Sequence, residues 1–141
     1  MSNITLLALA KADIKAAEMC VEHKDKLVKL HAAYCTQQAI EKTLKYVISL
    51  HTSDGTYPWG HDISKLVLQC RQMKIYVPDY IVEKADVFSS WEADTRYEAS
   101  IIVRKDTIKK AMDIVKEWHK SIASLKLLRN QEFFSFAVVR L

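Results

Sequence analysis

Glycine and proline, the residues that most often interrupt helices, are scarce in this chain. Its 141 residues include two glycines and two prolines. Because both residue types mark turns and break helices, their scarcity predicts few turns and long helices. Half of the residues are hydrophobic, which argues against a disordered chain. A chain of this length usually forms one domain and buries about 68–70% of its unfolded surface, so it needs no cross-link to hold a core.

Apolar residues repeat at helical spacing along most of the chain. This period predicts helices over residues 4–22 and 27–50, from Asp62 to about residue 73, from Pro78 onward, and from Asp106 to Asn130. Residues 89–105 leave two alternatives, a loop with an extended tail or a helix that runs on into the last one. We therefore expect an all-α fold, an antiparallel up-and-down bundle of four to five helices.

The expected bundle occupies residues 1–128, and an apolar tail of uncertain role occupies residues 129–141. The tail can pack on the bundle, cover a dimer contact, or be foreign to the natural domain. An exposed apolar segment of this kind favours aggregation, so we expect something to cover it. Residues 51–60, HTSDGTYPWG, contain both glycines and predict one exposed loop, held in place by Tyr57 or Trp59.

The three cysteines, Cys20, Cys35 and Cys70, are not spaced like a disulfide framework or a zinc knuckle. Cys20 and His23 form half a metal motif without a second half, so we expect no metal and no cofactor. Free thiols are typical of a reducing, cytoplasmic compartment. The apolar run near the N-terminus is too short for a membrane span and follows no basic residue, so we expect a soluble protein without a membrane partner.

Positive charge is concentrated toward the end of the chain. Residues 96–141 carry ten of the 21 Lys and Arg residues and five acids, whereas residues 1–95 have a net charge of −1. A basic face attracts phosphate-bearing or acidic partners, although a solvated lysine face gives the same pattern. Charge alone therefore leaves the partner open.

Two polar residues interrupt the apolar stripe of the second predicted helix. Gln37 and Glu41 lie one turn apart on that stripe. Burying either group without a partner costs on the order of 1–3 kcal/mol, and more for a charged carboxylate. Each must therefore meet another helix, a second subunit or a ligand. In the simplest arrangement Glu41 pairs with Lys45, and Gln37 bonds to the end of a neighbouring helix.

Three short motifs in order resemble the HEPN domain, a helical family of higher eukaryotes and prokaryotes. They are QQAIEKTLKYVI in the second helix, GHDISKL before the third, and TRYE before the last. The resemblance covers about residues 4–125. It implies a helical bundle that forms a homodimer and is often encoded beside a minimal nucleotidyltransferase, as a toxin–antitoxin pair or a system resembling antibiotic modification.

The resemblance also implies which residues form a ligand site. The matching positions are Gln37, Gln38, Glu41, Lys45, His61, Asp62, Arg96 and Tyr97. From them we expect a site for a nucleotide or an RNA phosphate at Gln37, Glu41, His61, Asp62, Arg96 and Tyr97. The start of a helix attracts phosphate, a guanidinium can bind it with two hydrogen bonds, and a tyrosine ring can stack on a base. A purely structural alternative remains: Asp62 caps its helix beside a packed His61, and Arg96 pairs with Glu92 or Glu98.

One departure from the family concerns catalysis. Ribonuclease members carry an arginine followed by four to six residues and a histidine on the last helix, where the two act on the ribose hydroxyl and the phosphate. No arginine of this chain is followed by a histidine at that spacing. The sequence also has no glycine-rich phosphate loop, no G-x-S-x-G and no H-E-x-x-H. A thiolate–imidazole pair of Cys35 and His31 is conceivable, and a buried thiol is favoured.

Three functions remain open at this level. The first is a non-catalytic module that binds a nucleotide, RNA or a protein partner. The second is an atypical ribonuclease toxin whose arginine and histidine come from separate helices or subunits. The third is a plain interaction scaffold in which the polar pair only fixes the helix register.

Overall fold

The computed structural model describes the backbone of residues 3–97 and 103–139, and the side chains of residues 5–92 and 103–125. Within these ranges the secondary structure is entirely helical, which confirms the all-α prediction. The helices are α1 (Asn3–Val21), α2 (Lys26–Leu50), α3 (Ile63–Gln72), α4 (Asp79–Glu83), α5 (Ala85–Tyr97) and α6 (Lys105–Val139). The described part has more helices than expected because the predicted fourth helix is divided at Lys84 into α4 and α5.

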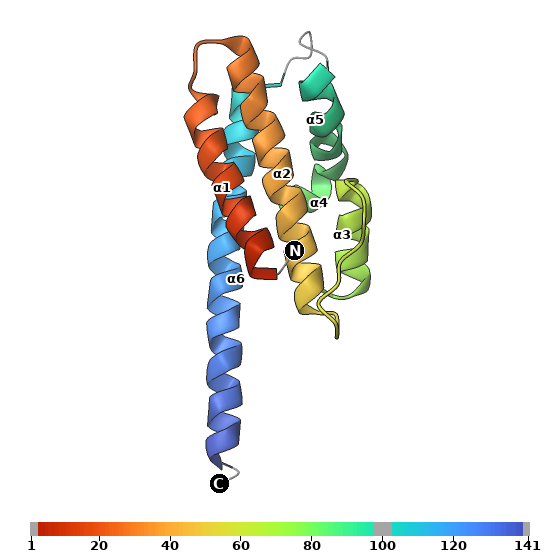
Figure 1. Cartoon of the computed structure of the whole chain (residues 1–141), viewed down its shortest axis with the longest axis vertical. Coiled ribbons are helices and arrows are strands. Elements are labelled where there is room, and N and C mark those ends of the chain that lie inside the picture. The colour runs from red at the N-terminus through yellow and green to blue at the C-terminus, as the bar shows by residue number, and fades with distance from the viewer. Residues whose placement is uncertain (1–2, 98–102, 140–141) are drawn as a thin grey trace.

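Helix α2 is the central element of the bundle. Figure 1 shows α1 lying antiparallel against it, α6 behind the pair, and α3, α4 and α5 along its other side. Because neighbours cover α2 on several sides, apolar and polar residues around most of its circumference are buried. This position explains why polar side chains of α2 lie inside the protein.

Large apolar side chains from every described helix, including Ile81 of the short α4, fill the space around α2. The largest of them that are fully buried include Tyr46, Ile40, Leu44, Ile48, Ile63, Phe88, Ile108 and Trp118. Burying a side chain of this size contributes about 1.5–3 kcal/mol each. Phe88 and Trp91 of α5 are both buried, and their rings meet edge to face with centroids 5.0 Å apart, so they form the apolar face of this helix.

Aspartates cap the two helices on which the candidate site depends. Asp25 caps α2 by accepting a hydrogen bond from the backbone N–H of Leu27 at 2.8 Å. Asp62 caps α3 by accepting one from Lys65 N–H, which confirms the capping role predicted for it. Asp106 was predicted to precede the last helix as its cap, but it lies in the first turn of α6. A carboxylate there still interacts favourably with the positive end of the helix dipole.

Helix α6 does not end at Asn130, so that prediction is wrong. The helix runs on to Val139, through the expected boundary at residue 128, and its last part projects beyond the rest of the bundle in Figure 1. The physical reason is that no glycine or proline follows Pro78 in the sequence, and a single asparagine is a weak stop signal. The three roles considered for residues 129–141, packing on the bundle, covering a dimer contact or being foreign to the domain, stay predictions.

The loop between α2 and α3 exists as predicted, but Trp59 does not hold it. The Trp59 side chain is 100% exposed, whereas Tyr57 packs against the core. The alternatives for residues 89–105 resolve in part: the chain is helical as far as Tyr97, and residues 98–102 lie outside the described residues. Among the described helices, none is both long and apolar enough to cross a lipid bilayer.

Candidate functional site

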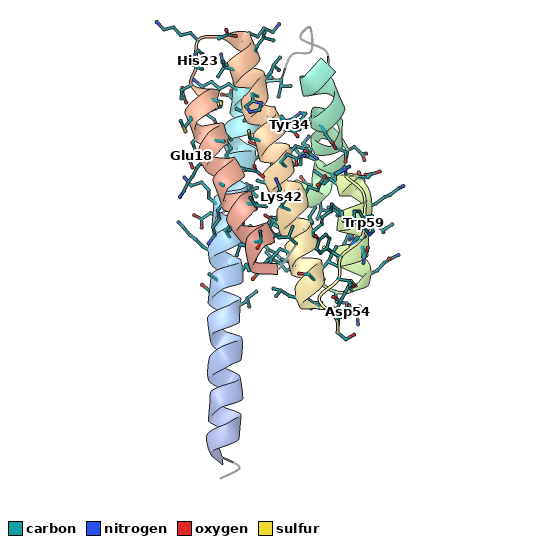
Figure 2. All side chains as sticks on the ribbon, in the orientation of Figure 1. Glu18, His23, Tyr34, Lys42, Asp54 and Trp59 are labelled. Carbon is teal, nitrogen blue, oxygen red and sulfur yellow. The ribbon has the colours of Figure 1, made fainter. Side chains whose placement is uncertain are left out.

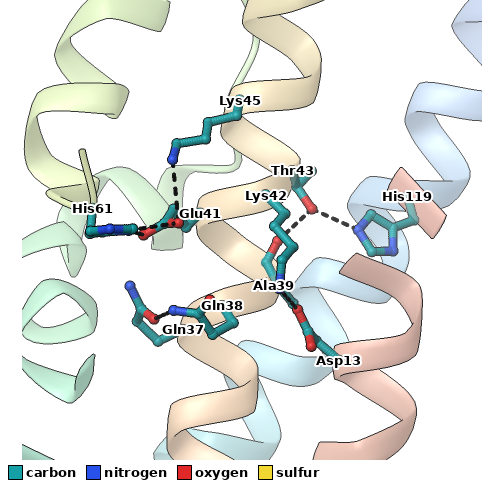
Figure 3. Close-up of polar contacts among 10 residues, drawn as sticks. All are labelled: Asp13, Gln37, Gln38, Ala39, Glu41, Lys42, Thr43, Lys45, His61 and His119. Carbon is teal, nitrogen blue, oxygen red and sulfur yellow. Dashed lines mark hydrogen bonds and ion pairs between the residues drawn. The ribbon is translucent and has the colours of Figure 1, made fainter. Parts of the chain in front are cut away.

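The buried carboxylate of Glu41 meets the ring of His61. Glu41 is 4% exposed, and its Oε1 and Oε2 lie 3.0 Å and 3.2 Å from Nδ1 of His61. The two residues belong to different elements, the middle of α2 and the loop that leads into α3 (Figure 3). His61 has a side chain that is 65% exposed, so this pair joins the interior to the surface.

Lys45 is the second partner of Glu41. The two residues lie four positions apart on α2, and the predicted contact between them is confirmed. Nζ of Lys45 lies 3.5 Å from Oε2 of Glu41 and 5.9 Å from the centroid of the Tyr57 ring. The pair is largely removed from water, with side chains 11% and 5% exposed. Glu41 therefore has a charge partner on Oε2 and an imidazole beside both of its oxygens.

The simplest arrangement predicted that Gln37 bonds to the end of a neighbouring helix, and this prediction is wrong. Oε1 of Gln37 accepts a hydrogen bond of 2.7 Å from Nε2 of Gln38. Its Nε2 is buried and has no hydrogen-bond partner among the described residues. Figure 3 shows this nitrogen on the same side of α2 as Glu41, pointing toward the Glu41–His61 pair. An unpaired buried amide costs about 1–3 kcal/mol, so the position is unfavourable unless something else satisfies it.

The start of α3 offers less to a phosphate than the sequence suggested. Asp62 accepts from Lys65 N–H, and Ile63 N–H donates to the hydroxyl of Ser89 at 2.9 Å. Ser89 also donates to Asp62 at 3.4 Å. Two of the N–H donors that a phosphate would need are thus already bonded inside the protein.

Arg96 and Tyr97, the remaining predicted site residues, lie in the last turn of α5. Their side chains lie outside the described residues. The structure therefore brings together Gln37, Glu41 and His61, with Asp62 next to His61 in the chain. Ligand binding by these residues stays a prediction.

Glu92 is a member of this cluster that the sequence did not assign to it. One oxygen of Glu92, on α5, lies within 4.8 Å of both the Glu41 carboxylate oxygen and the ligand nitrogen of His61. From its sequence position, Glu92 was expected only as an ion-pair partner of Arg96. The missing signal was the packing of α5 beside α2, which short-range motifs do not contain.

The other face of α2 holds a second buried histidine, with a different environment. His119 of α6 is 6% exposed, and its Nε2 lies 2.9 Å from the hydroxyl of Thr43. That hydroxyl donates its own hydrogen to the carbonyl of Ala39 at 2.7 Å. Its oxygen must therefore accept a hydrogen bond from the Nε2–H of His119. Burial, with a smaller effect of the charge on Lys11, lowers the pKa of His119 to about 4, so the ring is neutral at pH 7.

A basic hollow that His119 helps to line lies between α1 and α6. Its volume is about 320 Å³, and its lining includes Lys11, Lys15, Lys116 and Lys120 together with Glu18. Lys116 pairs with Glu18 at 3.1 Å, so part of the positive charge is neutralised. Farther along the same helix pair, hydrogen bonds from Lys105 and Lys109 lower the pKa of Glu22 to about 2. The basic face inferred from the sequence is therefore partly an α1–α6 ion-pair surface.

An apolar groove opens where α6 leaves the bundle. Its volume is about 520 Å³, and it is lined by the end of α2, the link between α3 and α4, and α6. Its lining residues are Val47, Leu50, His51, Lys74, Ile75, Tyr76, Trp118, Ser121, Ile122 and Leu125. A smaller hollow of about 300 Å³ continues it along α6 and shares Tyr76, Trp118 and Ser121. Tyr76 and Leu125 are more than half exposed, so the groove presents apolar surface to water.

The cysteines do not form a nucleophilic site within the described residues. Burial raises the pKa of the Cys35 thiol to about 11 and that of the Cys70 thiol to about 12. His31 packs its ring against Tyr34, with centroids 5.8 Å apart. A thiol with such a high pKa is protonated at pH 7, which argues against the pair of Cys35 and His31.

Comparison with known proteins places these features in a family. The family model described as the HEPN domain matches residues 5–125. Among solved structures, the crystal structure of TT1696 from Thermus thermophilus is similar, with a TM-score of 0.65 and 23% sequence identity over 86% of this chain and 96% of that chain. At this identity the likeness shows the fold alone. No curated protein matches this chain.

Proposed function

The chain belongs to the HEPN domain family, and we propose that it is a non-catalytic member that acts by binding protein partners. The proposed partners are a second copy of this chain and a nucleotidyltransferase, in a cytoplasmic pair of the toxin–antitoxin kind. The observation that carries the proposal is the apolar groove beside the projecting end of α6.

The absence of catalysis is supported by the state of the last helix. His119 is the one histidine that α6 contains, and it is buried, neutral at pH 7 and bonded to Thr43. Arg104, the arginine nearest to it on the N-terminal side, precedes the first turn of α6. A general base must reach the proton that it removes, and His119, although it lines the basic hollow, is only 6% exposed and is held by Thr43.

A second copy fits the groove because of what projects beside it. Residues 126–139 continue α6 beyond the bundle with the sequence KLLRNQEFFSFAVV, which is rich in leucine, phenylalanine and valine. A lone helix of this length is marginally stable in water unless an apolar face is covered. In a two-fold dimer, the projecting end of one copy lies on the groove of the other, and the reverse contact forms at the same time.

Oligomeric state tests this contact directly. We expect the purified chain to elute with the mass of a dimer in size-exclusion chromatography with light scattering. Leu125→Glu and Tyr76→Glu place a charge in the groove and should each give a monomer. Leu68→Glu is the matched control, because Leu68 is 56% exposed on α3 and does not line the groove. A wild-type monomer, or dimers in all three variants, would contradict the proposed interface.

The nucleotidyltransferase partner needs a separate measurement. We expect the chain to co-purify with the product of a neighbouring nucleotidyltransferase reading frame when the two are expressed together. The genetic neighbourhood is the first check, and a neighbourhood without such a frame would remove this partner. Incubation with total RNA tests the non-catalytic assignment: wild type, His61→Ala and His119→Ala should all leave the RNA intact.

The basic hollow favours a second candidate function, contact with the phosphates of a nucleotide or RNA. Four lysines around one depression attract phosphate, and the affinity of such contacts falls as salt rises. Labelled single-stranded RNA should then lose affinity when Lys11 and Lys15 are both replaced by glutamate. The paired change of Lys65 and Lys84 to glutamate is the control, because both are exposed outside the hollow. Equal RNA binding by the two double variants would exclude this site.

A further inference from the structure

We propose that Glu41, His61 and Glu92 bind a divalent transition-metal ion between α2, the start of α3 and α5, with the amide of Gln37 as a fourth ligand. The proposal does not depend on the partner-binding function, because none of these residues lines the apolar groove.

The three side chains already present the right atoms at short range. Nδ1 of His61 lies 3.0 Å from Oε1 of Glu41, and a carboxylate oxygen of Glu92 lies within 4.8 Å of both ligand atoms. An ion that binds nitrogen and oxygen at about 2.0–2.2 Å holds neighbouring ligands roughly 3–3.5 Å apart. The first pair already has this spacing through its hydrogen bond, whose proton a bound ion would replace. A small movement of Glu92, which is half-buried on α5, completes the set.

Gln37 supplies an independent sign that something is bound here. Its amide is completely buried, its Nε2 is unpaired among the described residues, and it points toward the cluster (Figure 3). Turning the amides of Gln37 and Gln38 together by 180° keeps the hydrogen bond between them with its direction reversed. The oxygen of Gln37 then points to where the nitrogen pointed, and an amide oxygen is a metal ligand. A bound cation would thus remove the cost of the unpaired group.

The charges of the cluster favour a cation over a phosphate. Glu41 and Glu92 each place a carboxylate oxygen near the ring nitrogen of His61. A phosphate brought here would meet both carboxylates, whereas a cation would be attracted to them. Lys45 shares Oε2 of Glu41 with His61, at 3.5 Å and 3.2 Å, and Oε1 lies beside His61 at 3.0 Å.

The ligand types indicate the class of ion. Imidazole with carboxylate and amide oxygens suits Zn²⁺, Mn²⁺, Fe²⁺ or Co²⁺, while Mg²⁺ and Ca²⁺ prefer oxygen alone. The exposed ring of His61 gives the ion a route from solvent. Glu41, which is buried, fixes the inner end of the site.

Metal titration of the full chain tests the proposal. After dialysis against a chelator, the chain should bind one equivalent of Zn²⁺ by calorimetry and of Co²⁺ by its visible absorption. His61→Ala and Glu92→Gln should each weaken binding by about 100-fold or more, because even the loss of an outer partner of a metal ligand typically costs 10–100-fold. Gln37→Leu should weaken it by about tenfold. His31→Ala is the control, an exposed histidine of α2 outside the cluster.

Each contrary result has a definite meaning. No binding, or binding that survives unchanged in His61→Ala, would overturn the site. A strong thiolate band in the Co²⁺ spectrum would overturn it too, because it would place the ion at Cys20 beside His23. Unchanged affinity in Gln37→Leu would overturn the amide as a ligand. His61 is exposed, so its variant folds, and circular dichroism of each variant without metal verifies this.

Discussion

Helix α2 has buried polar side chains on two faces, one toward α6 and one toward α3 and α5. The two faces differ in whether these groups find hydrogen-bond partners inside the protein. Toward α6, the hydroxyl of Thr43 and Nε2 of His119 satisfy each other, and the ring is only 6% exposed. Toward α3 and α5, Glu41 meets an exposed His61, and Gln37 keeps an unpaired nitrogen among the described residues. Figure 3 shows both groups at nearly the same level of the helix.

The difference separates a structural polar contact from one that is ready for a ligand. Buried groups that bond only to each other fix the packing of two helices and leave nothing to bind. A cluster with an unpaired buried amide and an exposed imidazole can still bind a ligand. Variants on the two faces should therefore differ in the size and even in the sign of their effect on stability. Figure 2 draws the described side chains of the whole chain, among them Lys42 of α2 and Trp59 of the loop before α3.

Thr43→Val should give the largest effect. The substitution keeps the shape of the side chain but removes the oxygen that accepts from His119, so a buried N–H is left without a partner. We expect a loss of about 2–3 kcal/mol in the free energy of unfolding, measured by urea denaturation. Thr36→Val is the matched control. Thr36 is also buried in α2 and also donates to a carbonyl four residues back, but no histidine depends on it. Equal losses in the two variants would contradict the proposed role of His119.

The pH dependence of stability should show the next largest effect. The pKa of His119 is about 4 in the folded chain and 6.5 for an ordinary histidine, so between these values the unfolded chain binds a proton that the folded chain does not. Stability is therefore full above about pH 6.5 and falls as the pH drops toward 4. We expect a loss of about 2 kcal/mol from this group, after a discount for partial solvent screening.

His119→Gln isolates that contribution from the carboxylates that titrate in the same range. Glutamine keeps a donor near Thr43 but takes up no proton. The difference between wild type and the variant, measured by urea denaturation at pH 7 and again near pH 4.5, should shrink as the pH falls. A constant difference would show that His119 does not titrate in this range.

The sequence predicted the local features of the bundle better than the contacts between distant residues. The helical period showed that Gln37 and Glu41 are buried, and the position of Asp62 before an apolar run identified the cap of α3, because both signals arise within a few residues. The pairing of Thr43 with His119 joins positions 76 residues apart. It depends on how α2 and α6 cross, which no local pattern specifies.

Glu92 and Trp59 show the same limit in the candidate site. Glu92 lies near Glu41 and His61 because the buried Phe88 and Trp91 pack α5 against the bundle. Tyr57 or Trp59 was expected to hold the loop, and the sequence could not choose between them: Tyr57 packs against the core, whereas Trp59 is fully exposed. The end of α6 was misplaced for a different reason: Asn130 looked like a stop signal, but the residues after it are good helix formers or neutral.

Gln37→Leu should change stability in the opposite direction from Thr43→Val. Leucine has nearly the same volume and removes the unpaired amide from the interior. The substitution also removes the hydrogen bond with half-buried Gln38, so the expected net gain without metal is about 1 kcal/mol. Urea denaturation of chelator-treated protein measures it. A loss above about 1 kcal/mol would show that the amide is satisfied in the native chain.

His61→Ala should have the smallest effect on the metal-free chain and is the most informative of the four. Its side chain is 65% exposed, and Glu41 keeps Lys45 as a partner when the imidazole is gone. We therefore expect a change of about 0.5 kcal/mol or less in chelator-treated protein, measured by urea denaturation. Wild type should gain stability when Zn²⁺ is added, since an ion that binds only the folded state shifts the equilibrium toward it, and His61→Ala should not. If His61 instead served mainly to hold α3 against α2, its loss would lower stability equally with and without Zn²⁺, and the two faces of α2 would then be structural alike.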